Sequence, residues 1–158
     1  AILRLILDIL VQFILSGDPM ISQTAEYALR AMVFLAMNSE KPQVTELIAS
    51  GTRVPGSYLS KVLQALSRAG LVKSQRGLGG GFTLSSSPDS ITILEIVNAV
   101  DPIRRIEKCP LDLESHGTVL CALHKRLDQS IELVEQAFEK TTLEEILSKP
   151  TDSIPLCE

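Results

Sequence analysis

The stretch VPGSYLSKVLQALSRAGLVKSQRGLGGGFTL, residues 54–84, decides the fold. Leucine and valine recur within it at spacings of three and four, which predicts an amphipathic helix after Pro55 with one buried face. Proline suits the first turn of a helix, and Gly70 is placed to end the helix in a left-handed conformation. The residues predicted to be buried are Leu59, Val62, Leu63 and Leu66.

The opposite side of this helix carries a polar stripe, because residues at i, i+4, i+7 and i+11 share a face. Its members are Ser57, Lys61, Gln64 and Arg68. Two short strands are predicted next, at 71–75 and 82–84, and the loop between them, 76–81, is rich in glycine and basic at Arg76. A helix with hydrogen-bonding groups and positive charge, followed by a basic β-hairpin, is typical of a winged helix-turn-helix that reads DNA.

Other interpretations of the stretch are weaker. A G-x-G-x-x-G nucleotide-binding loop would need glycine where Phe82 stands, and no Lys-Ser or Lys-Thr follows the glycines as in a P-loop. A polar stripe alone is also typical of a solvated surface helix. The order of the parts, a short helix, a turn, a polar-striped helix and a basic wing, favours DNA binding.

Residues 20–147 resemble the winged-helix transcription regulators typified by IscR and NsrR, the Rrf-type regulators. The matching segments are EYALR at 26–30, SYL at 57–59, GLV at 70–72, RGxGGGF at 76–82 and ITILEIVxAVD at 91–101. The resemblance implies a homodimeric regulator in which Ser57 and Tyr58 contact DNA and Arg76 enters the minor groove. A glutamate that contacts DNA in the family is Ser60 here, so the operator preference of IscR does not carry over.

The formal charge of −4 is unevenly distributed over the 158 residues. Residues 20–90 contain seven basic and four acidic side chains, whereas 91–158 contain seven basic and thirteen acidic ones. A basic N-terminal part (20–90) and an acidic C-terminal part (91–158) are compatible with a protein that contacts DNA phosphates on one face only. We expect Lys61, Arg68 and Lys73 to contact phosphates, with Arg53 contributing from the turn before the helix.

We predict a mostly α-helical fold with a small β-hairpin wing and a long C-terminal dimerisation helix. The predicted segments are an N-terminal amphipathic helical extension (1–19), the winged helix-turn-helix domain (20–100), a cysteine-containing sensor loop (101–122), the dimerisation helix with a short terminal helix (123–149) and a flexible tail (150–158). Residues 2–15 are apolar but too few to span a bilayer and lack a signal-peptide cleavage site, so we expect no membrane partner and a cytoplasmic location. The extension is interpreted as a helix packed on the body or on a partner subunit, with a membrane-surface helix as the alternative.

Within the DNA-binding domain, helices are predicted at 22–38 and 44–50, followed by a turn at 51–54. The apolar circumference of the first helix indicates a central, buried position. Thr92-x-x-Glu95 is a capping box that opens a further helix ending at Val100.

The long helix from Leu123 has an apolar stripe formed by Leu123, Leu127, Ile131, Val134 and Phe138. A second copy of the chain is the simplest partner to bury it, and packing within one chain is the alternative. A dimer would present two reading helices to adjacent major grooves, which predicts a near-palindromic operator in double-stranded DNA.

The three cysteines form an odd number in a chain with no secretory pattern, which indicates thiols kept for metal or redox chemistry. Cys109 and Cys121 flank a loop, and His124 follows Cys121 by three residues, so that this pair can face one metal. Thiolate and imidazole suit iron–sulfur clusters and zinc. Cys157 is interpreted as an idle thiol.

Many members of the resembling family hold an iron–sulfur cluster on three cysteines of this loop. Cys109 and Cys121 match the first and third, and Ser115 stands at the middle position. The resemblance adds His124 as a ligand and Glu26 of the partner subunit as an acidic one. Four interpretations stay open: a cluster on Cys109, Cys121, His124 and Glu26, a regulator that has lost the cluster, a zinc site with His116, and a disulfide switch between Cys109 and Cys121.

An enzyme is not expected, because the sequence contains no nucleophile–base constellation, no G-x-S-x-G and no H-E-x-x-H. No small-molecule substrate is expected either. The principal rival is a winged-helix protein-interaction module without DNA binding, which the acidic C-terminal half favours.

Overall fold

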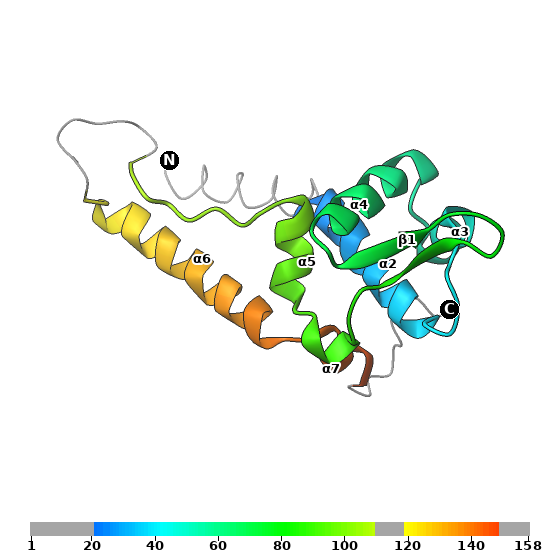
Figure 1. Ribbon diagram of the computed structural model, residues 1–158. Coiled ribbons are helices and arrows are strands. Elements are labelled where there is room, and N and C mark those ends of the chain that lie inside the picture. The colour runs from blue at the N-terminus through cyan, green and yellow to red at the C-terminus, as the bar shows by residue number, and fades with distance from the viewer. Residues whose placement is uncertain (1–20, 110–118, 149–158) are drawn as a thin grey trace.

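The computed structural model of the chain describes residues 21–109 and 119–148. Four helices form the body, α2 (Gln23–Met37), α3 (Thr45–Thr52), α4 (Gly56–Arg68) and α5 (Ile93–Val100), and a small hairpin of β1 (Val72–Gln75) and β2 (Gly81–Leu84) lies at its edge, as Figure 1 shows. A short 3-10 helix, η1 (Pro88–Ser90), precedes α5, and the long helix α6 (Ala122–Lys140) and the short α7 (Leu143–Ser148) complete the order. The predicted extension 1–19, the tail 150–158, Ser115, His116 and Cys157 lie outside the described residues.

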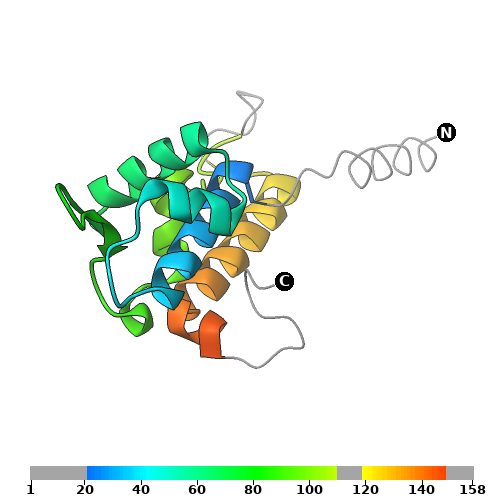
Figure 2. The same ribbon diagram turned by 90° about the vertical axis from the view of Figure 1, so that its right-hand side faces the viewer.

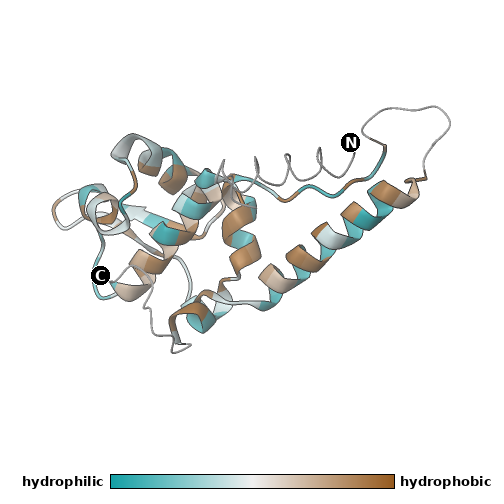
Figure 3. Cartoon of the chain, turned by 180° about the vertical axis from the view of Figure 1, so that it is seen from behind, coloured by the Kyte–Doolittle hydropathy of each residue, from teal (hydrophilic) through white to brown (hydrophobic). Residues whose placement is uncertain are grey.

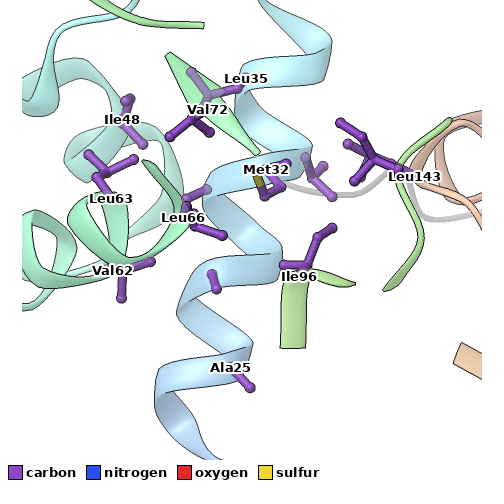
Figure 4. Packing of buried hydrophobic residues seen from close by; sticks show 14 of the residues in the cluster. Ala25, Met32, Leu35, Ile48, Val62, Leu63, Leu66, Val72, Ile96 and Leu143 are labelled. Atoms are coloured by element: carbon purple, nitrogen blue, oxygen red, sulfur yellow. The ribbon is translucent and has the colours of Figure 1, made fainter. Parts of the chain in front are cut away.

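Helix α2 is the centre of the core, as its apolar circumference predicts. It packs against α3, α4, α5 and α7. Figure 4 shows Met32 of α2 between Leu66 of α4 on one side and Ile96 of α5 and Leu143 of α7 on the other. These four side chains are fully buried, and burying a side chain of this size contributes about 1.5–3 kcal/mol.

The N-termini of α2 and α5 are capped by the side chains that the sequence places there. The hydroxyl of Ser22 accepts a hydrogen bond from the Ala25 N–H at 3.2 Å, which caps α2. Thr92 and Glu95 form the predicted capping box, with the Thr92 N–H donating to the Glu95 carboxylate at 2.8 Å and the Glu95 N–H donating to the Thr92 hydroxyl at 3.2 Å. The predicted first helix and capping box are therefore confirmed.

The predicted turn at 51–54 is partly wrong, because α3 continues through Gly51 to Thr52. The buried Thr52 hydroxyl donates to the Ile48 carbonyl at 2.6 Å, which satisfies a carbonyl in the last turn of the helix. Pro55 likewise precedes α4 rather than forming its first turn, since its ψ of 132° is extended. The connection between the two helices is correspondingly short.

The hairpin has the antiparallel register Val72↔Leu84 to Gln75↔Gly81. The chain before α3 also pairs with it: the Gln43 N–H donates to the Phe82 carbonyl at 2.9 Å, and the Phe82 N–H donates to the Gln43 carbonyl at 2.8 Å. The hairpin is therefore fixed to the body through its second strand.

Helix α6 contacts α5 and lies on the side of the molecule opposite the hairpin, as Figure 1 shows, and Figure 2 shows the same chain from the side of the hairpin. None of its 19 residues is buried within one chain. The chain then returns to the core, where the Leu143 N–H donates to the Ile91 carbonyl at 2.8 Å and Leu143 is fully buried. The C-terminal end of α6 is therefore held against the body through Leu143.

Candidate nucleic-acid interface

One face of α4 is buried and the opposite face is open. Leu59, Leu63 and Leu66 are fully buried against the rest of the domain. The polar residues at helical spacing therefore point outward, and all four members of the predicted stripe are exposed: Ser57, Lys61, Gln64 and Arg68. A helix of 13 residues with this polar face provides hydrogen-bond donors and acceptors along about 20 Å.

Tyr58, at the start of α4, is 55% exposed, and it is held on one side by an aromatic contact. Its ring meets the ring of Tyr27 of α2 edge to face, with the centroids 6.2 Å apart. The Arg30 guanidinium lies 5.9 Å from the centroid of Tyr27, and Glu26 binds Arg30 at 3.0 Å. This chain of contacts fixes the ring of Tyr58 while leaving half of the residue accessible.

Arg53 lies between α3 and α4 and ends α3 in the left-handed conformation, with φ 55° and ψ 32°. It is the one non-glycine residue with positive φ in the described part of the chain. The residue is exposed, while its neighbours Thr52 and Val54 are buried. The turn therefore holds a basic residue at a backbone conformation that favours glycine.

The wing adds two more exposed basic residues, Lys73 on β1 and Arg76 at the first position of the loop. Gly81 approaches the body so closely that a Cβ there would lie 2.5 Å from the carbonyl oxygen of Gln43. Gln43 is itself buried, and its side-chain amide donates to the Lys41 carbonyl at 3.0 Å. The wing is thus attached to the α2–α3 connection, a contact that the sequence analysis missed because it joins residues about forty positions apart.

The surface formed by Arg53, α4 and the wing contains only one sign of charge. Between Glu46 and Asp89 the sequence has five basic side chains and no acidic one. All five are exposed: Arg53, Lys61, Arg68, Lys73 and Arg76. A local excess of positive charge on an otherwise acidic chain attracts a polyanion to this face.

The residues predicted to bind a metal are only partly brought together. Cys121 occupies the N-cap position of α6 without a side-chain capping hydrogen bond, and its Sγ lies 3.2 Å from Nδ1 of His124. Cys109 is buried at the other end of the loop, and Glu26 is on α2 in its ion pair with Arg30. No group of three His, Cys, Asp or Glu side chains within reach of one metal occurs in the described ranges 21–109 and 119–148.

A second charged cluster lies where the chain leaves α5, and the sequence analysis did not identify it. Arg105 binds Asp128 of α6 through two hydrogen bonds and lies 3.4 Å from Glu132 and 3.5 Å from Glu135. The Ile106 N–H also donates to Asp128, at 2.9 Å. The segment leading to Cys109 is thereby fixed to α6, the helix that follows Cys121.

Comparison with known proteins identifies the chain. The profile of the Rrf2 family, described as an iron-dependent transcriptional regulator, matches residues 21–149. The chain belongs to the Rrf2 family. It is 34% identical over 130 residues to the HTH-type transcriptional regulator CymR of Bacillus subtilis, which covers 81% of this chain and 89% of CymR.

Solved structures agree with the winged-helix fold of this Rrf2 protein. The structure of CymR, the global cysteine regulator of B. subtilis, superposes with a TM-score of 0.69 at 30% identity, over 84% of this chain and 99% of that one. The structure of T. potens IscR gives a TM-score of 0.67 at 24% identity, over 84% and 88% of the two chains, and supports the fold alone. The predicted fold class and family are confirmed, and the protein is a DNA-binding transcription regulator rather than an enzyme.

None of the helices in the described part of this Rrf2 protein has the length and apolar character required to cross a membrane.

Proposed function

We propose that this Rrf2 protein binds a near-palindromic operator as a homodimer through α4 and the wing, and that a group held at the cysteine loop sets its affinity. The observation that carries the DNA contact is the acid-free surface of Arg53, α4 and the wing, on the side of the molecule away from α6 (Figure 1). In this proposal Ser57, Tyr58 and Gln64 contact base edges in the major groove.

The basic residues are proposed to contact the DNA backbone and the minor groove rather than base edges in the major groove. Lys61, Arg68 and Lys73 contact phosphates, with Arg53 beside them, and Arg76 enters the minor groove from the wing. Phosphate contacts of this kind supply most of the affinity and a steep dependence on salt concentration. They also fix the register in which α4 enters the groove.

The second copy is proposed to pack on α6. Along this helix Leu123 is 63% exposed, Leu127 46% and Leu133 67%, and Figure 3 shows hydrophobic residues at intervals over its length. The opposite face is occupied by the contact of Asp128 with Arg105, so the outward apolar face needs a partner from elsewhere. A symmetric helix pair meets this need with one surface used twice.

Sedimentation of the full chain tests the dimer. Leu127→Glu places a charge in the proposed interface and is expected to yield monomers at concentrations at which the parent is dimeric. The control Gln136→Glu places the same charge at an exposed position on the side of α6 opposite Leu127, nine residues further along the helix, and should remain dimeric. A monomeric parent, or a dimeric Leu127→Glu variant, would reject α6 as the interface.

The group at the cysteine loop is proposed to be an iron–sulfur cluster. Cys121 and His124 converge to 3.2 Å at the start of α6, and the two thiols and the imidazole are soft and borderline ligands that suit iron. Cys109, Cys121 and His124 would hold the group, with Glu26 of the partner subunit as a fourth ligand. A bound cluster would supply a site whose occupancy and redox state follow the conditions of the cell, and the description of the family as iron-dependent supports this choice over zinc.

Two measurements test the function. Binding to random duplexes across a salt titration is expected to weaken steeply with salt, and Lys61→Ala or Arg68→Ala should each reduce the slope by about one. Iron and sulfide assays with an absorption spectrum, on protein purified without oxygen, are expected to show iron, sulfide and visible bands that Cys121→Ala removes. Salt-insensitive or absent DNA binding would favour an interaction module, and zinc without iron would reject the cluster.

A further inference from the structure

The tip of the wing presents one apolar side chain entirely to solvent. Leu78 has a relative exposure of 109%, the largest among the exposed large hydrophobic residues of the described chain. Figure 1 shows the loop between β1 and β2 projecting beyond the body. Leu78 does not belong to the hydrophobic core, and a side chain this exposed buries no apolar surface within one chain. It therefore contributes little to the stability of the fold.

The loop holds Leu78 in a defined turn. The residues on either side are Gly77, with φ 95°, and Gly79, with φ 76°. The Gly80 N–H donates to the Gly77 carbonyl at 2.9 Å, and a Cβ on Gly80 would lie 2.3 Å from the carbonyl oxygen of Gln75. The turn is therefore closed on itself, and it has no side chains beside Leu78 to obstruct a close approach.

The surroundings of the tip indicate what Leu78 meets. Arg76 lies two residues before it and Lys73 lies on the adjoining strand, both exposed. Positive charge next to a narrow, unobstructed turn fits the minor groove, where the negative potential is concentrated. Proteins that bind there insert leucine or other apolar side chains between base pairs and partly unstack them.

We propose that Leu78 is an apolar wedge that enters the minor groove beside Arg76 and partly unstacks one base step. This inference rests on the proposed contact of the wing with DNA and adds a source of sequence preference to it. Pyrimidine–purine steps unstack at the least cost. The operator is therefore expected to contain a pyrimidine–purine step under each wing. The preference for this step would arise without hydrogen bonds from the protein to its bases.

The test uses the full-length protein and a duplex that the parent selects from a pool of random duplexes. 2-Aminopurine replaces adenine at successive steps in the region protected by the wing, and its fluorescence reports unstacking. The parent is expected to raise the fluorescence at one step. Leu78→Ala should abolish the rise and weaken binding on the order of tenfold, because less apolar surface is removed from water. Leu78→Met, which keeps a long apolar side chain, should retain most of both effects.

The outcomes separate the wedge from the wing contact on which it rests. Because Leu78 is fully exposed, its variants should unfold at the temperature of the parent, which checks that the fold is intact. If Arg76→Ala loses affinity while Leu78→Ala binds and unstacks like the parent, the wedge is rejected and the wing contact stands. If neither substitution changes binding, the wing does not touch DNA and both proposals fail.

Discussion

Arg105 and Asp128 form a two-point ion pair that joins the segment after α5 to α6. Nε of Arg105 donates to Oδ1 of Asp128 at 2.7 Å, and Nη2 donates to Oδ2 at 2.6 Å. The fork of the guanidinium matches the carboxylate, which is the geometry that gives the strongest hydrogen bonds between charged side chains. Arg105 lies between the end of α5 and Cys109, and Asp128 lies in the second turn of α6, so the pair holds the start of the cysteine loop against this helix.

This ion pair predicts how stability depends on pH. The hydrogen bond from Arg105, and after it that from the Ile106 N–H, lower the pKa of Asp128 to about 2. A carboxylate with a depressed pKa stabilises the fold above its unfolded pKa, about 4, and loses that contribution as the pH falls through 2. The difference in free energy of unfolding between the parent and Asp128→Asn, from urea titrations, should be constant at pH 5–7 and shrink steadily between pH 4 and pH 2. A difference that does not change with pH would contradict the assignment.

The same pair predicts a local change in backbone dynamics. Arg105→Lys keeps the charge but removes the fork, so that the segment should detach from α6 more often. Hydrogen exchange of the Ile106 amide, which donates to Asp128 at 2.9 Å, should become faster in the variant while the amides of α2 keep their protection. Arg104→Lys, a substitution at the adjacent exposed residue, is the control and should leave the exchange of Ile106 unchanged.

The sequence predicts the local elements of this fold well and its long-range contacts poorly, for a physical reason. Helix α4 and the capping box at Thr92 are determined by residues three or four positions apart, and such spacing is visible along the chain. Arg105 and Asp128 are 23 residues apart, and Gln43 and Phe82 meet only once the core has folded. The same limit applies to the candidate site. The exposed stripe of α4 follows from periodicity, whereas a convergence of Cys109 with Cys121 depends on a loop path that periodicity does not determine.

The attachment of the wing predicts that Gly81 cannot be replaced. Its φ is 149°, and a Cβ would lie 2.5 Å from the Gln43 carbonyl oxygen, so Gly81→Ala should lower the free energy of unfolding by about 2–3 kcal/mol. Gly56→Ala is the matched control, since nothing lies within 4 Å of a Cβ at that position. This control should be neutral or more stable by up to about 1 kcal/mol, because alanine favours the helix. Equal effects of the two substitutions in chemical denaturation would show that the close approach to Gln43 is not a constraint.

Arg53 provides a prediction in which stability and DNA binding diverge. Its left-handed φ of 55° disfavours a residue with a Cβ, so a comparison of Arg53→Gly with Arg53→Ala isolates the backbone, since both variants lack the guanidinium and its contacts. The glycine variant should be more stable than the alanine variant by about 1 kcal/mol in chemical denaturation. Both should bind DNA more weakly than the parent and to the same extent, with a salt slope lower by about one. Equal stability of the two variants would contradict the strained turn, and parent-like binding by both would remove Arg53 from the DNA-contacting surface.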